Sequence, residues 1–150
     1  MTTRILFVCL GNICRSPTAH AVFQTLARAE GLDVEVESAG TGGWHVGDPP
    51  DPRAIRAAAG RGYDLTRLRA CQVRAADFAT YDLILAMDRS NLTALERMRP
   101  IDSETPVSLF LDFAEADRDE LPDPYYDGSF DLVLDLVEDA SRGLIRHLAG

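Results

Sequence analysis

The feature that most constrains the fold is an apolar run followed by a glycine-bearing loop and a helix signal. Residues 4–8 (R-I-L-F-V) are rich in strand formers, and the loop after them contains Gly11. Ser16 and Pro17 then predict a helix start, with proline at the first helical position. A strand that runs through a short loop into a helix is typical of a β-α-β unit, in which the strands are parallel.

The rest of the chain repeats this alternation. Strands are expected at 4–8, 34–37, 83–87 and 107–110. Helices are expected from Ser16 to Gly31, at 52–61, at 74–78, at 91–98 with Ser90 as the cap, and at 129–148. Residues 39–52 and 112–128 are expected to be loops. The pattern predicts one α/β domain over residues 1–150, with a parallel sheet covered by helices on both faces.

Composition excludes several function classes. The net charge is −9, which argues against a nucleic-acid partner, and all 15 basic residues are arginine. Without lysine, Schiff-base chemistry and a G-x-x-x-x-G-K-[ST] nucleotide loop are excluded. Three cysteines do not form a secreted disulfide framework, and the three histidines show no metal-ligand spacing. With no signal segment and no membrane-length apolar run, we expect a cytoplasmic protein without a metal or membrane insertion.

Ligands of parallel sheets bind beyond the carboxyl ends of the strands, so chemistry is expected in the loop 9–16. Backbone N–H groups of such a loop, together with a helix N-terminus, bind a phosphate. Gly11 allows a backbone conformation that a side chain would penalise, and Arg15 can bind two phosphate oxygens. The positive field of these N–H groups, the helix N-terminus and Arg15 is expected to favour the thiolate of Cys9, which would be a nucleophile for in-line attack. The phosphate-binding residues are expected to be Leu10, Gly11, Asn12, Ile13, Cys14 and Ser16.

Two of these assignments have simpler alternatives. Cys9 could be a small buried hydrophobe at a strand end, which the context of the whole loop disfavours. Cys14 could fill the core, or it could form a reversible disulfide with Cys9 under oxidation, and the sequence leaves both readings open. Cys71 stands alone in a polar region and is expected to be structural.

A second motif, L-P-D-P-Y-Y at residues 121–126, offers a general acid. A phenoxide leaving group needs a proton, since phenol has a pKa near 10. Asp123 lies between two prolines that stiffen its loop, and Tyr125 and Tyr126 offer an aromatic wall. Alone, this motif would indicate a surface turn. Beside the cysteine loop it predicts an acid that later activates water.

At this point the sequence resembles the low-molecular-weight protein tyrosine phosphatases. The family signature V-C-x-G-N-I-C-R-S-P matches residues 8–17, and D-P-Y-Y matches residues 123–126. Further family segments match at 38–44 (S-A-G-T-G-x-W), 51–53 (D-P-R), 77–80 (D-F-A-T) and 87–91 (M-D-x-S-N), so the resemblance covers nearly the whole chain.

The resemblance implies a doubly wound four-stranded parallel sheet and cofactor-free hydrolysis of phosphotyrosine and other aryl phosphates. Cys9 would be the nucleophile, Arg15 the phosphate ligand and Asp123 the acid and base. Asn12 would hold the loop, and Ser16 would donate a hydrogen bond to the sulfur. Trp44, with the paired tyrosines, would form the wall of the substrate slot, although core packing is its simpler reading. The expected partners are a phosphotyrosine protein and inorganic phosphate or similar oxyanions, and the chain would be a monomer or weak dimer.

One departure from the family pattern H-x-A-R-Q is visible at residues 68–72. Leu68 replaces the histidine that supports the loop asparagine, and Cys71 replaces the arginine. Leucine cannot form that hydrogen bond, so a softer phosphate loop is expected.

Three other functions compete with this interpretation. Arsenate reductases of this fold need two further downstream cysteines, and only Cys71 is available. Phosphoarginine phosphatases carry threonine where Ile13 stands. A non-catalytic phosphotyrosine-binding module would be expected to lack the nucleophile, the arginine or the acid, whereas all three are present.

Overall fold

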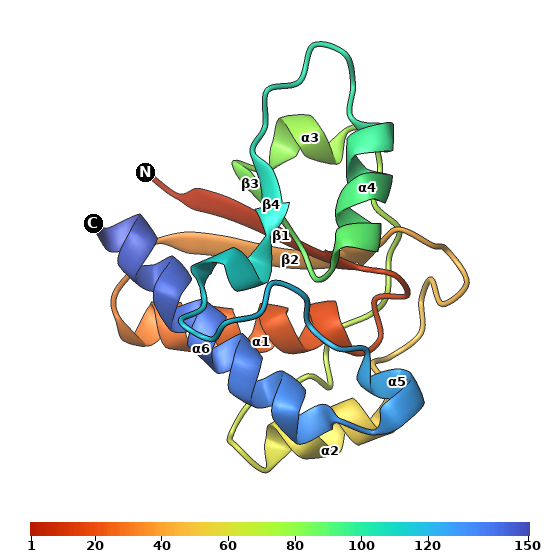
Figure 1. Ribbon diagram of the computed structural model, residues 1–150, viewed down its shortest axis with the longest axis vertical. Helices are drawn as coiled ribbons and strands as arrows, with labels where there is room; N and C mark the ends of the chain where they lie inside the picture. Colours follow the sequence, from red (N-terminus) through yellow and green to blue (C-terminus); the bar gives the residue numbers. More distant parts are fainter.

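The computed structural model describes residues 1–150 and contains one four-stranded parallel sheet (Figure 1). The strand order is β2-β1-β3-β4. The strands are β1 (Thr3–Cys9), β2 (Val34–Gly40), β3 (Leu83–Ala86) and β4 (Val107–Leu109). The predicted α/β fold with a four-stranded parallel sheet is therefore confirmed.

Helices cover both faces of this sheet, as expected. Figure 1 shows α1, α2 and α6 on one side and α3 and α4 on the other. Their bounds are α1 (Arg15–Ala29), α2 (Pro52–Ala59), α3 (Asp77–Thr80), α4 (Arg89–Met98), α5 (Pro124–Asp127) and α6 (Phe130–Ala149), with a 3₁₀ turn η1 at Phe110–Phe113. No helix combines the length and the apolar character that a membrane span needs.

The central strand β1 serves both layers because its side chains alternate between the two faces. Ile5 and Phe7 belong to the larger core under α1 and α6, whereas Leu6 and Val8 belong to the smaller core under α3 and α4. The Phe7 ring meets the Phe110 ring edge-on at 4.9 Å between centroids. These four side chains of β1, Ile5 to Val8, are buried, so the strand that leads into Cys9 is rigidly held.

The starts of α1, α3 and α4 differ from the sequence prediction. The first helix begins at Arg15, and Pro17 occupies its third position, which costs no hydrogen bond because the first turn of a helix leaves its N–H groups unpaired. Asp88, and not Ser90, caps α4: its carboxylate accepts the Asn91 N–H at 2.8 Å. At the expected helix 74–78, the carboxylate of Asp77 accepts the Arg74 N–H, so a turn precedes α3.

Two further corrections concern the predicted loops. Strand β2 continues to Gly40, because Ala39 and Gly40 stay in register with Val8 and Cys9. A Cβ at Gly40 would lie 2.8 Å from the Leu10 carbonyl oxygen, so only glycine lets the strand approach the loop this closely. The segment 112–128 contains a helical turn, α5, which Asp123 caps.

The strand order determines where in the fold a ligand site is expected. Chain connections run from β1 outward to β2 and then back across to β3, so β1 and β3 flank the point where the order reverses. Parallel sheets bind ligands in the crevice beyond the carboxyl ends of such strands. The loops after β1 and β3 both open into this crevice.

Candidate active site

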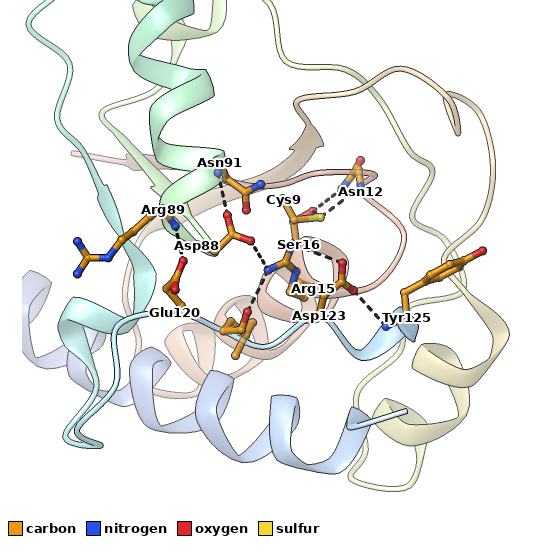
Figure 2. Close-up of polar contacts among 11 residues, drawn as sticks. Cys9, Asn12, Arg15, Ser16, Asp88, Arg89, Asn91, Glu120, Asp123 and Tyr125 are labelled. Carbon is orange, nitrogen blue, oxygen red and sulfur yellow. Dashed lines mark hydrogen bonds and ion pairs between the residues drawn. The ribbon is translucent and has the colours of Figure 1, made fainter. Parts of the chain in front are cut away.

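The Cys9 sulfur lies at the end of β1, where Cys9 is 3% exposed. The Asn12 backbone N–H donates to it at 3.2 Å, and the Ser16 hydroxyl lies 3.0 Å away (Figure 2). Two donors directed at one sulfur, close to the start of α1, are a setting that stabilises negative charge on it. A hydrophobe that only filled the core would not gather these donors.

The side chain of Asn12 fixes the direction of the hydrogen bonds around the sulfur. Its Oδ1 accepts the backbone N–H of Cys71 at 2.9 Å, and its Nδ2 donates to Ser16 Oγ at 2.7 Å. A backbone N–H can only donate, so the amide orientation is set. Ser16 Oγ is then an acceptor from Asn12, and its own proton is free for the sulfur of Cys9, the nearer of its two acceptors.

The conformational role expected for Gly11 belongs to Asn12. Asn12 has φ = 58°, and Gly11 is not in the left-handed region. Asparagine tolerates this region better than most residues. At Gly11 the constraint is one of space: a Cβ there would lie 3.3 Å from Cδ2 of His45, a tight contact that the His45 side chain would have to relieve.

Arg15 is held by three oxygens before any ligand arrives. Its Nη1 donates to Asp88 Oδ2 at 2.8 Å and to the Leu121 carbonyl at 3.0 Å, and its Nη2 lies 3.7 Å from Asp123 Oδ2. Burial by itself would lower the pKa of Arg15, but Cys9, Asp88 and Asp123 outweigh it and raise that pKa above its ordinary value. The guanidinium is thus a fixed cation beneath the phosphate loop.

Asp88 is a site residue that the sequence analysis did not single out. It follows β3 at the switch point, and its two oxygens act separately: Oδ1 caps α4, and Oδ2 holds Arg15. The M-D-x-S-N segment and the carboxyl end of a buried strand were the available signals.

The acid candidate Asp123 lies across the cleft from Cys9. Its Oδ1 accepts the Tyr125 N–H at 3.1 Å and caps α5 (Figure 2), and its side chain is 31% exposed. The Leu121 N–H donates to the Met87 carbonyl at 2.9 Å, which ties the start of this loop to the end of β3. The surface turn that D-P-Y-Y alone would indicate is thus directed at the cysteine loop.

A cleft of about 380 Å³ brings nearly all of the expected residues together. Asn12 and Ser16 lie behind it, and one lining residue, His45, was not expected. Trp44 is 72% exposed, so its simpler reading as a core residue is wrong. The lining residues are Cys9, Leu10, Gly11, Ile13, Cys14, Arg15, Trp44, His45, Asp123, Tyr125 and Tyr126.

The two other cysteines have different surroundings. Cys14 is buried, and burial, with Asp51 and Cys9 adding to it, raises the pKa of its thiol to about 12. A reversible disulfide with Cys9 stays one of the two readings that the sequence leaves open for Cys14. Cys71 is exposed, and its thiol donates to the Ser38 carbonyl at 3.2 Å. Although the residue is exposed, its sulfur is partly buried, which raises the pKa of Cys71, and Asp77 and Glu37 add to that effect.

The loss of loop support that Leu68 implied does not occur at Asn12. Both ends of its amide are paired, and the donor to Oδ1 is the main chain of Cys71, which no side-chain replacement removes. Leu68 itself is half-buried and packs against the larger core. The expectation of a softer loop therefore loses its premise.

The fold and this loop define the class: an α/β protein with a C-x-x-x-x-x-R loop at the switch point of a parallel sheet. The family model described as low molecular weight phosphotyrosine protein phosphatase matches residues 4–150. A low molecular weight protein-tyrosine-phosphatase of Streptomyces coelicolor is 44% identical over 153 aligned positions, which cover 97% of this chain and 93% of that protein.

Solved structures agree with this match. The crystal structure of YfkJ from Bacillus subtilis superposes with a TM-score of 0.94 at 37% identity, covering 99% of this chain and 96% of that one. DARP, a Drosophila arginine phosphatase, superposes with a TM-score of 0.91 at 30% identity, covering 97% and 98%. The chain belongs to the low molecular weight phosphotyrosine protein phosphatase family, which is a family of hydrolases.

Proposed function

We propose that this protein hydrolyses phosphotyrosine and other aryl phosphate monoesters through a phosphocysteine intermediate on Cys9. The observation that carries the proposal is the gathering of Cys9, Arg15 and Asp123 around one cleft, although Cys9 and Asp123 lie far apart in the sequence. A nucleophile, a fixed cation and a carboxyl group are the three parts that this reaction requires.

In the first step, the phosphoryl group is bound by the loop N–H groups and by Arg15. The Cys9 thiolate attacks phosphorus in line, a sulfur–phosphorus bond forms, and the bond to the phenolic oxygen breaks. Asp123 donates a proton to the departing phenoxide.

In the second step, the same carboxylate accepts a proton from water, which attacks the phosphocysteine. Phosphate forms, and sulfur leaves as the thiolate. The Ser16 hydroxyl oxygen lies 3.0 Å from that sulfur, and its proton stabilises the negative charge that returns to the sulfur. Released phosphate and similar oxyanions are therefore expected to inhibit competitively.

The lining of the cleft supports an aryl substrate. Trp44, Tyr125 and Tyr126 stand exposed around it, and the two tyrosine rings meet edge-on at 5.1 Å. Ile13, also at the cleft, adds an apolar contact for a flat ring. A phosphotyrosine protein is the partner that this site fits. A cytoplasmic location and a monomeric or weakly dimeric state stay predictions.

The test is hydrolysis of an aryl phosphate and a phosphotyrosine peptide in the presence of a chelator. Turnover should be independent of metal, nearly abolished in Cys9→Ser, and strongly reduced in Asp123→Ala, least for leaving groups that need no proton. Phosphoarginine and arsenate serve as comparison substrates. Preferred turnover of either, or full activity in Cys9→Ser, would overturn the proposal.

A further inference from the structure

Arg53, at the start of α2, connects two loops of the site through side-chain contacts. Its Nε donates to Asp51 Oδ1 at 3.1 Å, and its Nη2 donates to Asp51 Oδ2 at 2.9 Å. The same Nη2 also donates to the Tyr125 carbonyl at 3.2 Å. The guanidinium carbon lies 5.5 Å from the centre of the Tyr125 ring and 5.0 Å from that of Phe130.

Asp51 continues this connection to the phosphate loop. Its backbone N–H donates to the Ile13 carbonyl at 2.8 Å, and its side chain is 9% exposed. The hydrogen bond from Arg53 holds the pKa of the Asp51 carboxyl below its ordinary value, so the pair stays charged. The rigid fork of arginine makes such a two-point contact directional.

The connection ends in residues 121–126, here called the acid loop, one hydrogen bond from Asp123. The Tyr125 N–H donates to Asp123 Oδ1 at 3.1 Å. Other contacts hold the opposite end of this loop: the Leu121 N–H to the Met87 carbonyl, and Arg15 to the Leu121 carbonyl. Arg53 therefore binds the other end of the acid loop, at Tyr125 in α5, which those contacts do not reach.

We propose that Arg53, held by Asp51, is a positioning residue for the general acid. It fixes the acid loop relative to the phosphate loop, so that the Asp123 carboxyl group stays in reach of the leaving oxygen. This inference rests on the proposed function. It assigns Arg53 no contact with the reacting atoms.

The test compares Arg53→Met with Arg99→Met. Arg99 is a matched control, because it also contacts a carboxylate with two nitrogens, Glu96 at 3.1 and 3.0 Å, and lies over an aromatic ring, Phe78, away from the cleft. We measure kcat/KM for phenyl phosphate, whose leaving group needs a proton, and for 2,4-dinitrophenyl phosphate, whose leaving group does not.

Arg53→Met should lower kcat/KM for phenyl phosphate about tenfold, part of the effect of a general acid, and leave the dinitrophenyl ester within about twofold. For Arg53→Lys, kcat/KM for phenyl phosphate should lie between the values of the unmodified chain and of Arg53→Met. Arg99→Met should match the unmodified chain on both esters. In an Asp123→Asn background, Arg53→Met should have no further effect, because the group that it positions is gone.

Three outcomes would overturn the inference: unchanged kinetics in Arg53→Met, an equal loss on both esters, or a loss that persists in the Asp123→Asn background. Circular dichroism melts of each variant show whether Arg53→Met folds as Arg99→Met does, and Arg53→Lys provides the second reading if it does not. An unmodified protein inactive on both esters would refute the proposed function itself, which is a distinguishable result.

Discussion

Asn12 Oδ1 accepts its hydrogen bond from the backbone of Cys71 at 2.9 Å, fifty-nine positions along the chain. This contact fixes which end of the Asn12 amide faces Ser16, and so leaves the serine proton for the Cys9 sulfur. The hydrogen bonds behind the Cys9 sulfur thus have one direction, which begins at a main-chain donor. The main chain of Cys71, outside the cleft, therefore orients the hydroxyl group that faces this sulfur.

Asn12→Asp tests this direction. The carboxylate can still accept from Cys71, but the oxygen that replaces Nδ2 now draws the Ser16 proton away from Cys9. A hydrogen bond to a charged group contributes about 1.5–3 kcal/mol, so kcat should fall about 10- to 100-fold. Steady-state kinetics with an aryl phosphate measures this loss. Asn12→Asp activity equal to that of the unmodified protein would contradict the assigned direction.

Leu68→His should not improve the enzyme. The Asn12 amide already has both partners, and leucine at 68 packs against the larger core. Replacing a half-buried apolar side chain by imidazole should lower the free energy of unfolding by about 1 kcal/mol, without a rise in kcat. Urea unfolding and turnover measure the two quantities. An increase in both would show that the phosphate loop does lack support in this chain.

Asp88→Asn separates the two roles of Asp88. The amide oxygen can keep the helix cap at Asn91, but its NH₂ group then faces Arg15 in place of a carboxylate oxygen. Arg15 loses its charged partner, so kcat/KM should fall at least about tenfold, while the melting temperature changes little. Asp88→Ala removes both roles and should also melt earlier. If the two variants had the same stability, the cap would not contribute.

The stability of the fold should depend on His20. Burial, with a smaller contribution from Arg28, lowers the pKa of His20 from 6.5 to about 4. Between these values the unfolded chain binds a proton that the folded chain excludes, so stability is lost as the pH falls from 6.5 to 4. The full effect is on the order of 3 kcal/mol.

Urea unfolding across this pH range measures the dependence. In His20→Gln it should flatten, whereas His147→Gln, at an exposed position, is the matched control. An unchanged slope in His20→Gln would assign the effect to other groups.

The sequence predicts the parts of this protein that local patterns encode. The apolar runs and the glycine loop place Cys9 at a strand end, and the apolar positions of α6, Val133, Leu134 and Val137 among them, are buried as expected. These features depend on residues within one element. Periodicity therefore finds them without knowledge of the partners.

The missed features depend on contacts between elements. Nothing local distinguishes Asp88 from Ser90 as a cap, and only the neighbouring Arg15 explains why the carboxylate is there. The positive φ of Asn12 results from closing the loop around the sulfur, with Cys71 as its distant partner. Local propensity favours glycine for a left-handed backbone conformation and so points to Gly11, but the tertiary contacts of the loop place this conformation at Asn12.

The order of the elements along the chain has a consequence for synthesis on the ribosome. The cysteine loop emerges early, whereas the helix α6 that packs along α1 emerges last (Figure 1). A nascent chain that still lacks α6 already contains Cys9, Arg15 and Asp123, but it leaves the apolar face of α1 uncovered. The last helix to be made therefore closes the larger core, and until it packs the unfinished chain exposes apolar surface to its surroundings.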